Sequence, residues 1–126
     1  MIQDIPKQNE VVLKVALLLS ESKNFEQAIA IIQMIQDSPE KDEVLRNIAL
    51  RLVEQRNFKQ AITIAQMRSS ETLIDTTLGE LVDQFIQYGQ IIQALRAAQM
   101  IKADTLRAAK LEELLAMRLE EEDSHT

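Results

Sequence analysis

The sequence predicts an all-α fold, in which helix-turn-helix units repeat along the chain and stack as a solenoid. Of the 126 residues, 46% are hydrophobic but only 3% are aromatic, and there are two Gly and two Pro. This composition favours helices over strands. Short motifs recur at a fixed 33-residue interval, and the apolar side chains between them lie three or four positions apart. Both patterns are typical of a helical repeat protein.

The second half of each repeat carries the dipeptides Gln-Ala and Gln-Met. Gln-Ala occurs at 27–28, 60–61 and 93–94, and Gln-Met at 33–34, 66–67 and 99–100. The first half occurs four times as an apolar stripe at helical spacing: Val12, Val15, Ala16 and Leu19; Leu45, Ile48, Ala49 and Leu52; Leu78, Leu81, Val82 and Phe85; and Leu111, Leu114 and Leu115. Two short amphipathic helices joined by a turn therefore form one unit, which must stack on neighbours to cover its apolar face.

Seven helices are expected, over residues 9–22, 25–36, 41–55, 58–68, 71–87, 91–102 and 104–121. Pro39 suits a helix start or the turn before it. Ser69-Ser70 supplies an N-cap for the fifth helix, and Gly89 stops that helix at its C-terminus. The stripe Ala61, Ile64, Ala65 and Arg68 continues the fourth helix to residue 68.

The turn inside each unit resembles that of the tetratricopeptide (TPR) family. Asn24-Phe25-Glu26-Gln27-Ala28 and Asn57-Phe58-Lys59-Gln60-Ala61 carry the resemblance, and Gln90-Ile91-Ile92-Gln93-Ala94 is a weaker copy. The resemblance covers residues 9–121 as one domain. The repeat units are expected at 9–41, 42–74 and 75–107, followed by a capping helix at 108–121, with flexible ends at 1–8 and 122–126. The 33-residue period departs from the usual 34, and only Pro39 lies near the end-of-unit proline of the family.

The resemblance implies a right-handed superhelix in which the first helix of each unit lines a concave groove. The partner-binding residues expected there are Leu13, Lys14, Leu17, Arg46, Asn47, Leu50, Val53 and Ile86. Leu13, Leu17 and Leu50 lie off the packing stripe, as a groove for an apolar or amphipathic peptide requires. Burial of these leucines by the terminal helices or by a second copy stays open as the alternative. The family's carboxylate clamp is rejected, because Leu13 and Leu17 stand where it needs a basic residue and Asn.

Other candidate sites have simpler explanations. We interpret the methionines of the Gln-Met pairs as core residues. His125 is the only histidine and lies two residues from the end of the sequence, and we interpret the acidic run Glu120–Asp123 as a solvent-exposed helix end. Neither feature indicates a metal site or a catalytic base. The capping helix is expected to cover the last unit with Leu111, Leu114 and Leu115 and to face water with Glu112, Glu113 and Glu120. We expect no cofactor and no enzymatic activity.

The charge and the lack of cysteine limit the function further. A formal net charge of −6 argues against binding to nucleic acid or to an anionic membrane. Val11–Leu19 is not read as a signal peptide, because Lys14 interrupts it. The absence of Cys is compatible with the cytoplasm. The sequence thus predicts a cytoplasmic adaptor, scaffold or chaperone-like module that binds another protein or peptide. The alternative is a structural subunit that forms a homodimer through its helices, and a helical RNA-binding repeat is disfavoured by the acidic charge.

Overall fold

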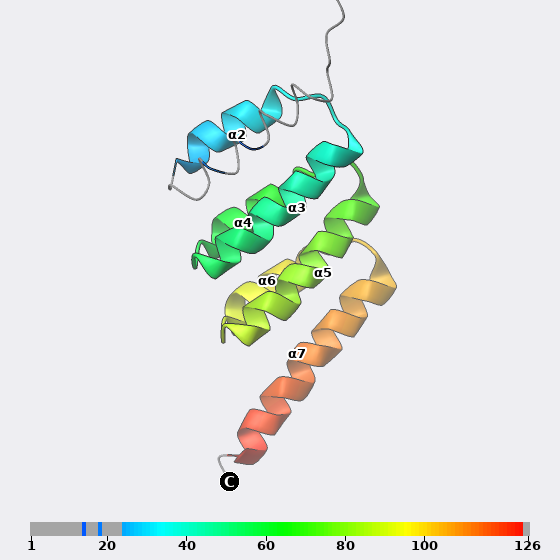
Figure 1. Ribbon diagram of the computed structural model, residues 1–126. Coiled ribbons are helices and arrows are strands. Elements are labelled where there is room, and N and C mark those ends of the chain that lie inside the picture. Colours follow the sequence, from blue (N-terminus) through cyan, green and yellow to red (C-terminus); the bar gives the residue numbers. More distant parts are fainter. Residues whose placement is uncertain (1–13, 15–17, 19–23, 125–126) are drawn as a thin grey trace, which may run out of the picture. The chain divides into compact units, whose positions relative to one another are not determined.

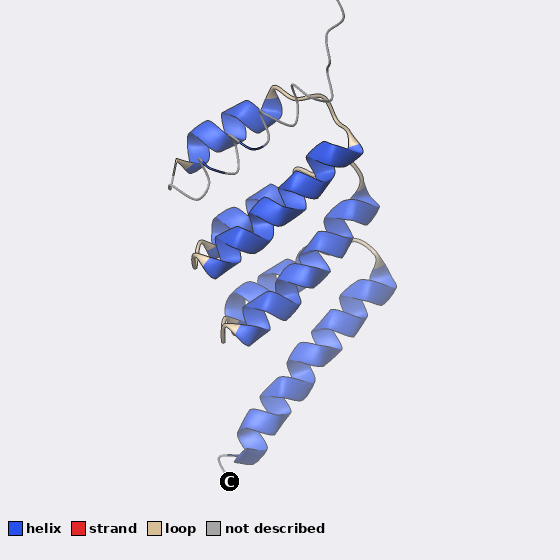
Figure 2. Ribbon diagram, viewed as in Figure 1, coloured by secondary structure: helices blue, strands red, loops and turns tan. Residues whose placement is uncertain are grey.

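The computed structural model describes residues 14, 18 and 24–124, with side chains up to Met117, and these residues form helices but no strand (Figure 2). The expected helix at 9–22 lies outside the described residues except for Lys14 and Leu18, so six helices are described where seven were expected. None of the six is long and apolar enough to cross a membrane. Their bounds are α2 (Phe25–Gln33), α3 (Pro39–Glu54), α4 (Phe58–Ala65), α5 (Glu71–Gln87), α6 (Ile91–Met100) and α7 (Asp104–Ser124), as labelled in Figure 1.

The helices pack mostly against their neighbours in sequence, within two compact units. The described residues up to Ser69 belong to the first unit, where α3 packs against α4. The described residues from Ser70 onward belong to the second unit, where α5 packs against α6 and α7 packs against both. The two α-hairpins, α3–α4 and α5–α6, are the copies of the repeat that can be compared directly.

Serine side chains begin the first helix of each hairpin. Ser38 Oγ accepts a hydrogen bond from the backbone N–H of Lys41 at 3.1 Å, and Ser70 Oγ accepts one from Leu73 at 3.2 Å. Each bond satisfies a backbone donor that the first turn of a helix leaves without a partner. Pro39 occupies the first helical position, where its missing N–H costs nothing, so α3 starts two residues earlier than expected.

The turns inside the two hairpins share one backbone conformation. Arg56 and Gly89, which occupy the same position of the repeat, both have a positive φ, of 64° and 71°. In each turn the next N–H reaches back to the helix, from Asn57 to the Leu52 carbonyl and from Gln90 to the Phe85 carbonyl, both at 2.8 Å. This is the Schellman arrangement. The predicted stop at Gly89 is confirmed, and Arg56 adopts the same left-handed conformation with a side chain that tolerates it less well.

The repeat alanines lie in the core, as the alignment of the repeats predicts. Ala28, Ala61 and Ala94 are fully buried. So are the stripe residues of the first helices, which are Leu45, Ile48, Ala49 and Leu52 in the first unit and Leu78, Leu81, Val82 and Phe85 in the second. Alanine at these positions permits a close approach of two helices, because it adds only a methyl group to the interface.

The second helix of each unit ends earlier than expected. α2, α4 and α6 end at Gln33, Ala65 and Met100, two or three residues before the predicted ends. The apolar period misled the prediction because it continues past the helix: Ile35, Arg68 and Ile101 are buried in the turn that follows. The interpretation of the methionines as core is wrong for Met34, which is 85% exposed, while Met67 and Met100 are half-buried.

The capping helix α7 only partly behaves as expected. Leu114 is 7% exposed, and Glu112 and Glu113 face water, as predicted. Leu111 is half-buried, and Leu115 is 59% exposed, so the prediction that Leu115 covers the last unit is wrong. The expected exposure of Glu120 concerns a side chain outside the described ones.

Candidate protein-binding surface

The face of α3 that lies opposite its buried stripe brings three of the predicted binding residues together. Arg46, Asn47 and Leu50 lie three or four positions apart and share the face opposite the buried stripe. Leu50 and Arg46 are half-buried and Asn47 is exposed. Nη1 of Arg46 lies 3.7 Å from Oε1 of Glu43 on the same helix. The face therefore offers one apolar side chain, one amide and one cation that already has a carboxylate neighbour.

Val53 does not belong to this surface. Its side chain is fully buried, because it continues the stripe of Ala49 and Leu52 into the core. The structure therefore places Val53 in the core and not on the predicted binding surface. Lys14 is exposed, as binding requires. Leu13 and Leu17 lie outside the described residues.

The second unit does not repeat the apolar part of this face. Ile86, the remaining predicted binding residue, is half-buried on α5 and is the repeat counterpart of Val53. The counterpart of Leu50 is Asp83, whose Oδ1 lies 3.0 Å from Nζ of Lys110 on α7. A methyl group added to Gly79, one turn earlier on α5, would meet Lys110 Cε at 3.5 Å. In this unit α7 therefore covers the part of α5 that carries Gly79 and Asp83.

The Lys110–Asp83 pair fastens α7 to α5. Burial lowers the pKa of Lys110, but the hydrogen bond and charge of Asp83, followed by those of Glu113, outweigh it and leave the pKa raised. Glu113 Oε1 lies 3.6 Å from the same ammonium group. The ammonium is thus held charged between two carboxylates, and its bond to Asp83 links α7 to α5.

Two aspartates that the sequence analysis did not single out close the hairpins. Asp42 is buried and accepts hydrogen bonds from the Ser69 N–H at 2.9 Å and the Ser69 hydroxyl at 2.6 Å. Asp75 is buried and accepts hydrogen bonds from the N–H groups of Lys102 at 2.9 Å and Ala103 at 3.0 Å. Each carboxylate sits near the start of a first helix and binds the backbone just after the second. The signal that could have identified them is their recurrence at one position of the repeat.

Buried or half-buried cations close the turns in a similar way. Nζ of Lys41 donates to the carbonyl of Ile35 at 2.9 Å, and Nη1 of Arg107 donates to the carbonyl of Ile101 at 3.0 Å. Both cations lie six residues after the carbonyl that they bind, where they satisfy a group that the ending helix leaves without an intrahelical partner. These cations therefore help to hold the turns in place.

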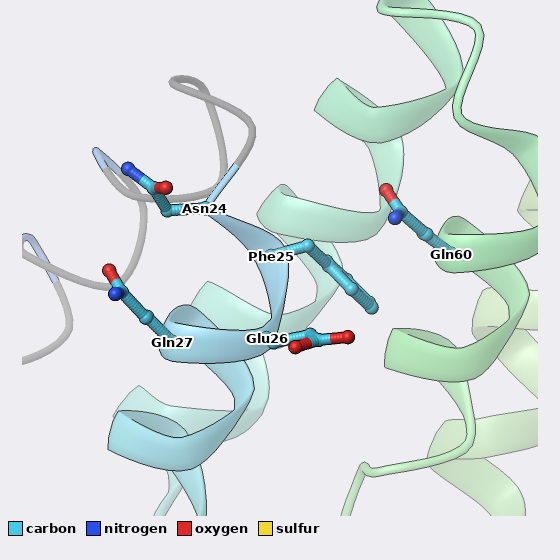
Figure 3. Close-up of a pocket in the computed structure, with 5 residues that line it drawn as sticks. All are labelled: Asn24, Phe25, Glu26, Gln27 and Gln60. Carbon is cyan, nitrogen blue, oxygen red and sulfur yellow. The ribbon is translucent and has the colours of Figure 1, made fainter.

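A shallow pocket lies at the turn between the first and second halves of the repeat. Its volume is about 310 Å³, and it is lined by Asn24, Phe25, Glu26, Gln27 and Gln60. Phe25 and Glu26 point toward the helix that carries Gln60, and the amide groups of Asn24 and Gln27 point away (Figure 3). The lining holds one carboxylate and three amides, without a nucleophile–base pair. Among the described residues no cluster of His, Cys, Asp or Glu is arranged to hold a metal ion.

Comparisons with known proteins find no match among protein-family models, curated proteins or solved structures. The function must therefore be inferred from the residues of this chain alone. Those residues are the repeat motif, the fully buried alanines of the hairpins, and the side chains that the first helices leave exposed.

Proposed function

We propose that the chain is a TPR-like helical-repeat module that binds an amphipathic segment of another protein on the face of its first helices that lies opposite the buried stripe. Leu50 carries the proposal: it stays partly exposed between Arg46 and Asn47, on the side of α3 that the core stripe does not use. An apolar side chain flanked by a cation and an amide suits a peptide with one apolar and one polar edge. The finer part of the proposal is that the units stack as a right-handed superhelix with these faces inside.

The chemistry of the face defines the segment that it would bind. The segment places an apolar side chain on Leu50 and a carboxylate beside Arg46. That carboxylate would compete with Glu43, and exposed ion pairs of this kind contribute about 0–1 kcal/mol, so the exchange costs little. Exposed Lys14 and Leu18 add a further cation and an apolar side chain to the same unit.

The proposal is tested with Leu50→Asp, compared with Thr63→Asp. Both variants add one negative charge, but Thr63 lies on the exposed side of α4, away from the proposed surface. Affinity capture from an extract of the source cells, quantified by mass spectrometry, should show partners that Leu50→Asp loses and Thr63→Asp keeps. Circular dichroism at 222 nm should show the same helix content for both.

Two outcomes would overturn the proposal. If Leu50→Asp captures the same partners in the same amounts as the unaltered chain, this face of α3 is not the binding site. If light scattering shows a dimer that Leu50→Asp converts to a monomer, a second copy covers the face and the chain is a structural homo-oligomer.

A further inference from the structure

The pocket at the start of α2 is bordered by two helices of the first unit. Asn24 to Gln27 come from the N-terminus of α2, and Gln60 comes from the first turn of α4. Phe25 and Glu26 point toward α4, so the ring, the carboxylate and the amide of Gln60 border one space (Figure 3). Its volume of about 310 Å³ is at the low end for ligand pockets, which measure about 300–1,000 Å³. A shallow pocket of this size suits a single side chain.

The lining of the pocket is complementary to a cation. Glu26 supplies a carboxylate, Gln60 supplies an amide oxygen, and the face of the Phe25 ring carries negative charge density. No lysine or arginine of the described part of the chain lines the pocket, and Glu26 forms no ion pair with a described residue. An anion would meet the carboxylate without any compensating charge, whereas a cation would meet three groups that attract it.

The carboxylate is not a feature of the repeat. The aromatic ring recurs, because Phe58 stands at the position of Phe25 in the next copy. The charge does not recur, because Lys59 and Ile92 stand at the position of Glu26. The packing of a hairpin therefore does not require an acidic side chain here, and Glu26 is exposed at the pocket. The negative charge sets this pocket apart from the same place in the other copies.

We propose that this pocket binds the guanidinium group of an arginine side chain that belongs to another protein. A guanidinium group is planar and always charged, and it presents five N–H donors in a fork that matches a carboxylate. Two of these donors pair with the Glu26 carboxylate, and the plane of the group lies against the Phe25 ring. A further N–H group donates to the amide oxygen of Gln60. The partner therefore carries an exposed arginine on the segment that reaches α2.

A lysine side chain suits this lining less well. Its ammonium group is a compact charge that holds its water more strongly than a guanidinium group, and it lacks a planar face to lie on the Phe25 ring. Because the pocket is shallow and Glu26 is exposed, an ammonium group would keep most of its hydration and gain little from the contact. The ring and the two-bond pairing with the carboxylate both favour arginine.

The pocket is separate from the α3 surface of the proposed function. It is formed by α2 and α4, the second helices of the repeat, and it uses none of Arg46, Asn47 and Leu50. The inference therefore stands independently of the proposed function, and each site can be removed by substitution without touching a residue of the other.

Titration of the isotope-labelled chain with the peptide acetyl-Gly-Arg-Gly-amide, followed by NMR, tests the proposal. The side-chain amide signals of Gln27 and Gln60 should shift and approach saturation. A peptide with citrulline in place of arginine has the same shape without the charge, and it should produce no saturable shift. A peptide with lysine in that place should bind at least about threefold more weakly.

Two variants with the same change in net charge locate the site. Glu26→Gln keeps the size of the side chain but removes the charge, so it should weaken binding of the arginine peptide about tenfold. Glu54→Gln is the matched control, because it removes one negative charge from an exposed position at the end of α3 outside the pocket. It should change the affinity less than about twofold. Phe25→Leu should also weaken binding, with circular dichroism showing that the helix content is kept.

Equal affinity of Glu26→Gln and the unaltered chain for the arginine peptide would overturn the proposal. So would binding of the citrulline peptide with the same affinity, or the absence of a saturable shift up to about 50 mM arginine peptide. A lysine peptide that binds as tightly as the arginine peptide would overturn the choice of arginine. Leu50→Asp should leave binding of the arginine peptide unchanged, which separates a failure of this site from a failure of the α3 surface.

Discussion

Replacing Asp75 with alanine should destabilise the second unit by about 2–3 kcal/mol. The carboxylate is buried and accepts two backbone hydrogen bonds, from Lys102 and Ala103. Hydrogen bonds to a charged group contribute about 1.5–3 kcal/mol each. The loss should fall below the sum of two such bonds, because Lys102 and Ala103 are exposed and water can reach their N–H groups in the variant.

Urea unfolding followed by circular dichroism at 222 nm measures the loss, with Thr76→Ala as the control at an exposed neighbouring position of α5. Asp75→Asn should give an intermediate value, because its amide oxygen keeps one acceptor. Units of a repeat protein can unfold separately. Amide hydrogen exchange should therefore be followed as well, and it should accelerate at Lys102 and Ala103 in particular.

Equal shifts of the urea midpoint in Asp75→Ala and Thr76→Ala, or unchanged exchange at residues 102 and 103, would show that the Asp75 carboxylate does not stabilise the second unit. The first unit offers an internal replicate. Asp42 binds Ser69 through both backbone and hydroxyl, so Asp42→Ala should change stability in the same direction. A loss confined to one of the two aspartates would show that the hairpins are not equivalent in this respect.

Three further predictions follow from the core, the turns and α7. Ala61→Leu should overpack the α3–α4 contact and lower the free energy of unfolding by about 1–3 kcal/mol. Thr63→Leu, on the exposed side of α4, should not lower it. Equal thermal melting temperatures of the two variants would count against the alignment of the repeats. Gly89→Ala should lower the free energy of unfolding by about 1 kcal/mol, because the φ of this residue is positive. Arg56→Gly should stabilise the equivalent turn for the same reason. A melting temperature that shifts in the opposite direction in either variant would refute this. Because the pKa of Lys110 is raised in the folded protein, the stability that its charge contributes is complete below the ordinary pKa of 10.5 and is lost as pH rises through the raised value. Lys110→Met should therefore flatten the fall in unfolding free energy at alkaline pH. An unchanged pH profile would contradict this role of Lys110.

Much of the fold follows from the sequence, because the repeat appears several times in one chain. The alignment of Gln27-Ala28 with its two copies predicted the helices and the buried alanines, and α5 has the predicted bounds. The ends of the second helices were placed too late because Ile35, Arg68 and Ile101 keep the helical period after the backbone has left the helix. The periodicity of side chains along the sequence indicates which residues are buried and not where the helix ends, and burial continues into the packed turn.

The candidate site was less predictable, since exposure depends on what a neighbouring element covers. Val53 was placed on the binding face by resemblance, but the stripe it shares with Leu52 takes it into the core. Leu115 occupies a repeat position whose counterparts Ala49 and Val82 are buried, yet it is exposed on α7. Asp42 and Asp75 were visible as a pair at one position of the repeat, but their acceptor role depends on backbone N–H groups that only the folded turn brings near.

The closure of each hairpin by its own aspartate bears on how such a chain changes length during evolution. The bonds from Ser69 to Asp42 and from Lys102 to Asp75 each span 27 residues and stay within one hairpin. A duplicated copy of one whole repeat inserted between Ser69 and Ser70 would interrupt neither bond and would bring its own aspartate with it. Insertions of other lengths within a hairpin would separate a carboxylate from its donors. Gain or loss of whole units is therefore the change in chain length that this architecture tolerates best.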